Sequence, residues 1–351
     1  MNPAFDEIIR ADAKTRQDLF STTAQRIGTA PQNTEKDFWV CWTLDALFNG
    51  LEGGPRLLFK GGTSLSKGFG LIRRFSEDID VTVFRDDLGQ DYSFEQLQDM
   101  SRKKRDKALD DIKAACEQYI NGDLADRLKV IATELAARAG IPSGQLVVEP
   151  NPEDSQSLLI RYPTATPASG YIDKVVKLES GAKSALDPNS VRSVVPYCGE
   201  DIPDLDLNVP NVTIVDAERT FWDKIVILHG LRRWFEIRGD LKGGGHRISR
   251  HYYDVHELME TDVGKKAVED LDLGADCVAH ALMFFNRPAF DLPSAHPPTF
   301  ALTPEGEMYD GLKRDYDAMT TMVFGDAPDF DAIVESVVDL QNSLNARAAG
   351  S

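Results

Sequence analysis

The sequence predicts an N-terminal α/β domain followed by a C-terminal bundle of helices. Two short apolar strands flank a glycine turn between residues 56 and 84. Residues 145–198 carry β-branched side chains between Pro, Gly and Asn breaks, which is typical of strands. From residue 215 onward the apolar side chains recur at helical spacing. Because 351 residues exceed one typical domain, we expect two, residues 1–210 and 211–351.

The expected elements follow from periodicity and from helix and strand breakers. Apolar spacing predicts a helix over residues 5–27, and Asn33 or Thr34 can cap the next helix. Pro203, Pro210 and Asn211 mark the boundary between the domains. In the first half we expect strands 56–60, 78–84, 145–149, 157–162, 170–179 and 191–197, with helices 63–70, 94–120 and 124–139. In the second half we expect helices 216–231, 249–260, 264–285, 304–324 and 329–346, and a glycine-rich loop over 238–246.

Two aspartates in the second apolar strand carry the strongest chemical signal. Side chains alternate along a strand, so Asp78 and Asp80 point to one face while Ile79 and Val81 point to the other. Carboxylates about 7 Å apart on one strand face repel one another unless a cation lies between them. Mg²⁺ prefers such oxygen ligands and usually combines one or two carboxylates with substrate phosphates. The pair therefore predicts a magnesium site.

The glycine turn that precedes this strand predicts a phosphate site. Gly61 and Gly62 allow backbone N–H groups to approach a phosphate, and Thr63 or Ser64 can add a hydroxyl donor. Each feature alone is weak, because Gly-Gly is usually only a turn, Thr63 can be a helix cap and exposed strands often carry acids. Together they predict the transfer of a nucleotidyl or phosphoryl group.

The run from Gly61 to Val83 resembles the signature of the AbiEii/AbiGii-type nucleotidyltransferase toxins. This family includes the mycobacterial MenT toxins and belongs to the DNA polymerase β-like nucleotidyltransferase superfamily. Three further blocks resemble the family in the same order: Lys177–Ser184, Glu218–Ile225 and Arg250–Val255. The resemblance covers residues 56 to 258, and its first and last blocks are the specific ones. It implies an α+β nucleotidyltransferase core with a mixed sheet.

Three acids are candidates for the catalytic site. We expect Asp78 and Asp80 to bind Mg²⁺. Glu179 is the candidate third acid, because it shares a strand face with Lys177, and it could deprotonate or orient the acceptor hydroxyl. The alternative for Glu179 is a surface ion pair with Lys177 or Lys183.

The resemblance adds two catalytic residues from the second half of the chain. It implies that Lys224 contacts the nucleoside triphosphate, a role that suits a compact point charge. It also implies that Asp254 belongs to the active site. The alternatives are a solvent-facing lysine on a helix, and an Asp254 that only pairs with Arg250 four residues earlier.

The first motif also supplies candidate nucleotide contacts. We expect Gly61, Gly62 and Thr63 to bind the nucleotide, and the resemblance implies the same role for Ser64. Lys67 is the remaining candidate, and Arg74 can reach phosphates as well. Both could instead be ordinary exposed charges.

Net charge limits how this chain can meet a nucleic acid. A formal charge of −18 argues against non-specific binding, because phosphate contacts supply most of that affinity. An RNA substrate would need positive charge that is concentrated locally. Arg102–Arg105 form one basic segment, although a solvated helix face explains it equally well. A second basic segment, with the same alternative, contains Arg232, Arg233, Arg238, Lys242, His246, Arg247, Arg250 and His251.

Composition points to a cytoplasmic protein that does not enter a membrane. No apolar run approaches the roughly 20 residues that span a bilayer, and the first residues lack a secretory signal pattern. The cysteines are widely scattered, without the spacing of a zinc site or a disulfide framework. They are Cys41, Cys116, Cys198 and Cys277.

These observations together predict a Mg²⁺-dependent nucleotidyltransferase toxin of a toxin–antitoxin system. The resemblance implies transfer of nucleotides from an NTP to an RNA acceptor, the 3′ end of tRNA, and a cognate antitoxin protein as partner. One alternative keeps the chemistry and has a protein or small-molecule acceptor, which suits the acidic charge. Another is a non-catalytic module that senses nucleotides or binds an antitoxin. The intact acid pair disfavours it.

Overall fold

The computed structural model describes residues 1–167 and 174–347, which fold as two compact units. The first unit contains Met1–Gly68 and Phe75–Val215. The second contains the described residues from Asp216 onward together with the short segment Phe69–Arg74. Part of the predicted strand 170–179 lies outside the described residues.

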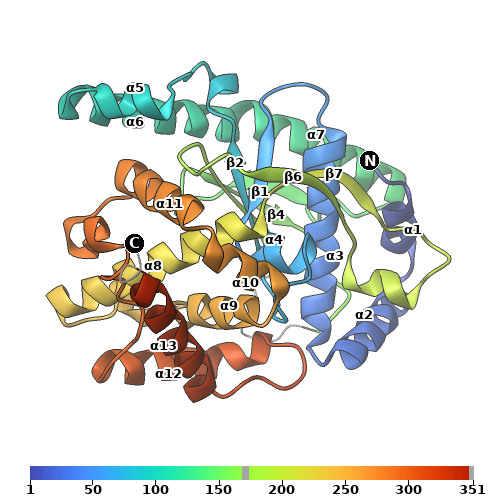
Figure 1. Ribbon diagram of the computed structural model, residues 1–351. Helices are drawn as coiled ribbons and strands as arrows, with labels where there is room; N and C mark the ends of the chain where they lie inside the picture. The colour runs from blue at the N-terminus through green and yellow to red at the C-terminus, as the bar shows by residue number, and fades with distance from the viewer. Residues whose placement is uncertain (168–173, 348–351) are drawn as a thin grey trace. The chain divides into compact units, whose positions relative to one another are not determined.

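A seven-stranded sheet organises the first unit (Figure 1). Its strand order is β3-β4-β5-β2-β1-β7-β6. β1 pairs antiparallel with β2 and parallel with β7, and β2 pairs parallel with β5, so the sheet is mixed as predicted. The α+β class is therefore confirmed. The strands are β1 (Leu57–Lys60), β2 (Asp78–Val83), β3 (Val147–Pro150), β4 (Ser157–Arg161), β5 (Val175–Gly181), β6 (Asn189–Val194) and β7 (Val209–Val215).

β7, which lies between β1 and β6, was not among the predicted strands. Pro210 and Asn211 indicated a break, because proline cannot donate to a strand ladder. In the structure they lie where the pairing of β6 with β7 shifts register between Arg192 and Val194, so they form a local irregularity. Asn211 adopts φ +61° there. The domain boundary expected after residue 210 falls within this strand.

Helix boundaries in the first unit follow local capping. The helix expected over residues 5–27 is two helices, because the Asp12 carboxylate accepts a hydrogen bond from the Thr15 N–H and caps the second. The next helix begins at Pro31 rather than at Asn33 or Thr34, since proline suits the first helical position. The helices are α1 (Ala4–Arg10), α2 (Ala13–Ile27), α3 (Pro31–Asp45), α4 (Gly61–Lys67), α5 (Phe94–Asp99), α6 (Arg102–Tyr119) and α7 (Ala125–Ala139).

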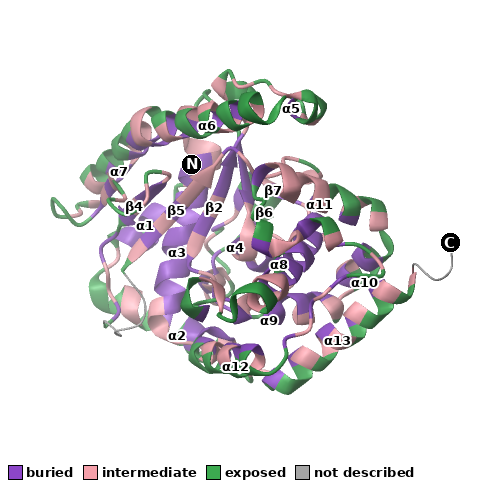
Figure 2. Ribbon diagram, turned by 90° about the vertical axis from the view of Figure 1, so that its left-hand side faces the viewer, coloured by how far each residue is buried: buried purple, intermediate pink, exposed green. Residues whose placement is uncertain are grey.

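Helix α3 runs through the interior of the first unit, although its sequence carries several charges. It is buried from Asn33 to Asp45 and packs against β5 and β7 (Figure 2). The Trp39 ring on α3 stacks on the Tyr162 ring, and the two ring centroids lie 5.4 Å apart. The charged side chains of Glu35, Lys36 and Asp37 all have polar or oppositely charged partners. A charged group can be buried at a tolerable cost only when it has such a partner.

The second unit is helical, as the sequence predicts. α8 packs against α9, α10 and α11, and the Trp222 indole on α8 donates a 2.9 Å hydrogen bond to the Ala267 carbonyl. The helix expected over 264–285 is interrupted at Asp270, whose side chain caps α11 through the Leu273 N–H. The helices are α8 (Ala217–Arg238), α9 (Ser249–Met259), α10 (Asp262–Glu269), α11 (Leu271–Phe284), α12 (Glu307–Met319) and α13 (Phe330–Ala346).

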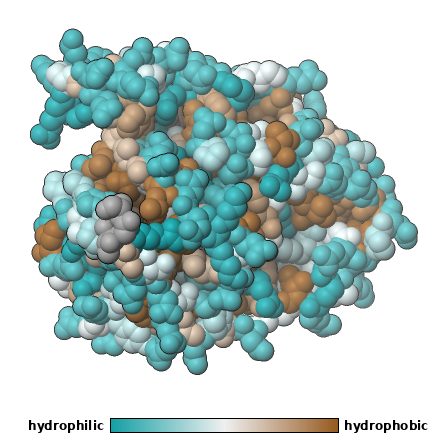
Figure 3. Space-filling model, viewed as in Figure 1, coloured by the Kyte–Doolittle hydropathy of each residue, from teal (hydrophilic) through white to brown (hydrophobic). Residues whose placement is uncertain are grey.

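The surface over α5 and α6 is strongly hydrophilic (Figure 3). Arg102, Lys103 and Lys104 are all exposed at the start of α6. Across residues 1–167 and 174–347, no helix is both long and apolar enough to traverse a bilayer.

Candidate active site

The glycine turn and the acid pair meet in the first unit. β1 ends at Lys60 and α4 begins directly at Gly61, so the predicted turn is the first turn of the helix. Gly61 has φ +81°, which side chains rarely adopt. A Cβ built on it would lie only 2.3 Å from Asp80 Oδ2. Glycine therefore lets the backbone of the turn approach the Asp80 carboxylate.

The alternation predicted for β2 is present. Ile79 and Val81 are fully buried, whereas Asp78 and Asp80 are half-buried on the other face of the strand. In the sheet, Lys60 of β1 pairs with Asp80, and Asp80 pairs with Glu179 of β5. Cross-strand partners share a face, so these three charged side chains form one row across the sheet.

Glu179 has a partner beside it on its own strand. Its carboxylate forms a 2.5 Å ion pair with the Lys177 ammonium, and both side chains are about one-third exposed, at 39% and 31%. Burial opposes the charge on Lys177, but Glu179 and then Asp78 outweigh it and raise the pKa of the lysine. The structure thus places Glu179 next to Asp80 and also shows the ion pair that was its alternative.

Thr63 and Ser64 are buried, and their hydroxyls are bonded within the protein. The Thr63 hydroxyl donates to the Asp78 carbonyl at 2.5 Å and lies 2.8 Å from the Ser76 hydroxyl. The Ser64 hydroxyl donates to the Gly61 carbonyl at 2.8 Å. Thr63 therefore joins α4 to the start of β2, and Ser64 closes the glycine turn.

Lys67 is a core residue rather than an exposed charge. Its ammonium lies 2.8 Å from the Asp37 carboxylate on α3, and the two side chains are only 3% and 2% exposed. It also lies 3.6 Å from the ring centroid of Tyr197. Burial would lower the pKa of Lys67, but the Asp37 carboxylate reverses this and raises it. The predicted phosphate contact would require this buried pair to break.

A second buried pair joins α3 to the residue before β2. The Lys36 ammonium lies 2.9 Å from the Glu77 carboxylate, and both side chains are under 10% exposed. Neither residue was a candidate from sequence. The only signal was the presence of charges within an otherwise apolar helix pattern.

The second unit contains a buried cluster around Asp254 of α9. The Arg74 guanidinium binds this carboxylate with two bonds, of 2.7 and 2.8 Å, and the Lys224 ammonium of α8 donates at 2.7 Å. Asp254 thus pairs with Arg74 and Lys224, whereas the sequence suggested Arg250. Arg74 also joins the second unit through a bridge to Val323. Neither Arg74 nor Lys224 is the exposed charge that the sequence left as its alternative.

Burial and charge act together on this cluster. Burial alone would raise the pKa of Asp254, but Arg74 and Lys224 hold it below its usual value. The pKa of Lys224 is lowered by burial and by Arg74, against the effect of Asp254. Burial, with Lys224 and Arg250 nearby, also puts the pKa of His251 well below its ordinary value, so this ring is neutral at pH 7.

The donor set in the first unit suits a hard cation with few protein ligands. Within the described ranges, no group of three or more His, Cys, Asp or Glu side chains is arranged to hold a metal. Asp78 and Asp80 offer carboxylate oxygens on one face, which is the kind of site that Mg²⁺ completes with water and phosphate oxygens.

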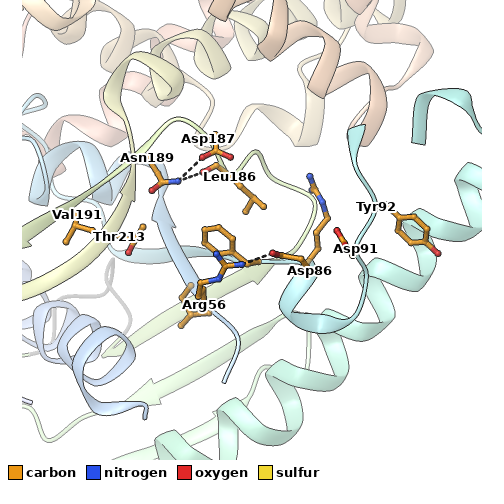
Figure 4. Close-up of a pocket in the computed structure, with 12 residues that line it drawn as sticks. Arg56, Asp86, Asp91, Tyr92, Leu186, Asp187, Asn189, Val191 and Thr213 are labelled. Atoms are coloured by element: carbon orange, nitrogen blue, oxygen red, sulfur yellow. Dashed lines mark hydrogen bonds and ion pairs between the residues drawn. The ribbon is translucent and has the colours of Figure 1, made fainter. Parts of the chain in front are cut away.

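A cavity of about 620 Å³ is lined by residues that include Arg56, Asp86 and Asn189 (Figure 4). The register of β1 with β2 places it at the opposite end of these strands from the acid pair. Its lining also includes Phe84, and the Arg56 guanidinium donates a hydrogen bond to the Asp86 carboxylate. Asp78 and Asp80 do not line it. In the register of β1 with β2, the cavity end of the strands, at Leu57 and Val83, is three residues from Asp80, which is about 10 Å along the strand. The cavity therefore does not contain the acid pair.

Two carboxylates on a mixed sheet, next to a glycine turn, are the arrangement that the sequence predicted for nucleotidyl transfer. The chain matches the family model described as "Nucleotidyl transferase AbiEii toxin, Type IV TA system" over residues 42–336. It therefore belongs to this family and is a nucleotidyltransferase, which confirms the resemblance found over residues 56 to 258.

None of the curated proteins matches the sequence. Among solved structures, the chain is similar to MenT4, a nucleotidyltransferase toxin from Mycobacterium tuberculosis H37Rv, with 16% identity and a TM-score of 0.41. The match covers 93% of this chain and 97% of MenT4.

Proposed function

We propose that this toxin transfers a nucleotide from an NTP to RNA, with the 3′ end of a tRNA as acceptor, and that Asp78 and Asp80 bind the Mg²⁺ that the reaction requires. The observation that supports this most directly is the close approach of Gly61 to the Asp80 carboxylate. It puts a turn suited to phosphate beside a pair of acids suited to a divalent cation.

The chain's own residues position the reactants. The backbone N–H groups of Gly61 and Gly62 form the phosphate contact, because glycine has no side chain that would keep a phosphate away from them. Ser64 adds a donor when its hydroxyl turns from the Gly61 carbonyl. Thr63 keeps α4 fixed to the first residue of β2, so the turn and the acid pair keep their spacing. The bound ion would polarise a phosphoryl oxygen and neutralise developing charge.

Lys224 and Asp254 serve the triphosphate. The Lys224 ammonium makes one hydrogen bond, to Asp254, among the residues that the structure describes, and an ammonium has three donors. The other two N–H groups are the proposed phosphate donors, and because the Lys224 side chain is only 7% exposed, the triphosphate must displace the groups that cover it. The Asp254 carboxylate holds the lysine in place and balances its charge, and Arg74 shares the same carboxylate. Both residues thus act on the nucleotide rather than on the acceptor.

Glu179 is the proposed third acid. Its register next to Asp80 suits a role in orienting or deprotonating the acceptor hydroxyl. To act as a base, Glu179 must leave the ion pair with Lys177. A separate cognate antitoxin completes the proposed system, since the family is that of toxins from toxin–antitoxin pairs.

Labelled substrates test both the chemistry and the acceptor. The purified protein is incubated with each α-³²P-labelled NTP and Mg²⁺, together with total RNA or with total protein from cells. We expect label in the RNA, concentrated in tRNA, and almost none with Asp80→Asn. Asp106→Asn, which changes an exposed acid on α6 in the same way, should transfer like the unmodified chain. Label that enters only protein would refute the RNA acceptor.

A further inference from the structure

We propose that the end of α8 and the turns beside it form a docking platform for single-stranded RNA. This inference rests on the proposed function, because it supplies the surface that holds the unpaired acceptor strand. Its centre is a pair of aromatic rings, Trp234 and Phe290, whose centroids lie 5.8 Å apart at an angle of 55°. Both residues are half-buried, so each ring stays partly accessible.

Three cations surround these two rings. The Arg238 guanidinium lies 5.5 Å from the Trp234 ring, and Lys242 and Arg287 lie 5.2 and 6.0 Å from the Phe290 ring. Within residues 1–167 and 174–347, none of the three takes part in an ion pair. The chain has 57 acidic and 39 basic residues, so cations without acidic partners are unexpected on its surface.

The nearby acids already have other partners. The Asp240 carboxylate accepts a 3.1 Å hydrogen bond from the Trp234 indole, which fixes the orientation of that ring. Glu236 and Asp291 lie 2.9 and 3.7 Å from the Arg233 guanidinium. The burial of Lys242 and the charge of Arg287 lower the pKa of Lys242, which agrees with two neighbouring cations.

Glycines bring these groups to one surface. α8 ends at Arg238 and is followed by Gly239, which has φ +74°, and the short turn Lys242–Gly245 contains three further glycines with positive φ. The chain can therefore reverse tightly after Arg238 and return Lys242 to the Phe290 ring. The platform consists of Trp234, Arg238, Lys242, Arg287 and Phe290.

The combination of rings and cations selects the kind of partner. Unpaired bases stack on aromatic rings and on guanidinium planes, and the sugar–phosphate backbone follows positive charge. A duplex keeps its bases stacked internally and would use only the cations. An acidic protein segment would likewise leave the rings unused. Single-stranded RNA uses all five side chains.

RNA binding without NTP tests the platform apart from catalysis. Fluorescence anisotropy measures the affinity for a labelled 12-nucleotide single strand over a range of salt concentrations. The double variant Arg238→Ala/Lys242→Ala should weaken binding at least tenfold and reduce the salt slope by about 1.4, the loss expected for two phosphate contacts on a single strand. Lys103→Ala/Lys104→Ala removes the same charge from α6 and should change the affinity less than twofold.

Trp234 variants test the stacking. Trp234→Ala should weaken binding by roughly five- to 160-fold, the range for one base–aromatic contact. Trp234→Phe should restore most of the affinity, with the Tm of each variant measured in parallel. Equal losses in both charge variants, or competition by poly-glutamate as strong as that by RNA, would overturn the proposal. So would a duplex that binds as tightly as the single strand.

The platform and the proposed function can fail separately. Asp80→Asn should keep its RNA affinity while it loses transfer. If RNA binds at the platform but receives no label, the proposed acceptor is wrong and the platform stands. If label enters RNA while the platform variants bind and transfer normally, the platform is wrong and the function stands.

Discussion

Gly61→Ala is the sharpest perturbation of the candidate site. The new Cβ would lie 2.3 Å from Asp80 Oδ2, whereas real Cβ contacts are essentially never below 3.0 Å, so the carboxylate must retreat by about 0.7 Å. A displacement of about 1 Å in a positioned group can cost on the order of 100-fold in rate. We therefore expect nucleotidyl transfer to fall roughly tenfold or more.

The left-handed backbone at Gly61 adds a cost in stability that needs a control. Alanine at φ +81° costs about 1–2 kcal/mol. Gly89→Ala is matched, because Gly89 has φ +72° and nothing lies within 4 Å of its added Cβ. Both variants should lower the Tm by a similar amount, and only Gly61→Ala should lose transfer of label from α-³²P NTP to RNA. Equal transfer by the two variants would refute the proposed link between the turn and Asp80.

Three further predictions concern the buried cations. Arg74→Ala should lower the free energy of unfolding by about 3–5 kcal/mol, while Arg73→Ala, at an exposed position, should change it by less than about 0.5 kcal/mol; matching urea midpoints for the two would contradict the buried cluster. Lys224→Ala should raise the KM for NTP roughly tenfold or more with an unchanged circular dichroism spectrum, and unfolding would show a structural lysine instead. Because the pKa of Lys224 is lowered, NTP use should decline with rising pH before an ordinary lysine deprotonates, and Lys224→Arg should move that decline to higher pH. Lys67→Met should lower the Tm without raising the KM for NTP, and a higher KM at constant Tm would show that Lys67 reaches the phosphates after all.

Local patterns in the sequence were sufficient to predict the elements that carry the acid pair. The period of two in β2 put Asp78 and Asp80 on one face, and the glycines located the reversal between β1 and β2, which forms the first turn of α4. β7 was missed because Pro210 is a reliable strand breaker unless the ladder is irregular at that point, and the partner strand that makes it so is not visible locally.

Partners far apart in the chain could not be predicted from spacing. Arg74 and Asp254 are 180 residues apart, and Lys224 and Asp254 are 30 apart, so helical periodicity offered only Arg250 as the partner of Asp254. Lys67 was expected at a phosphate because it follows the glycine turn. Its actual partner, Asp37, lies on a helix whose interior position depends on the whole sheet.

Metal binding by the acid pair tests the central claim most directly. Mn²⁺ accepts the same oxygen ligands as Mg²⁺, and electron paramagnetic resonance reports how much of it stays free in the presence of protein and a non-hydrolysable NTP. We predict that the unmodified chain removes Mn²⁺ from solution and that the Asp78→Asn/Asp80→Asn variant, folded by circular dichroism, leaves it at the level set by the NTP alone. Equal Mn²⁺ uptake by the two proteins would contradict the assignment of these aspartates as the metal ligands.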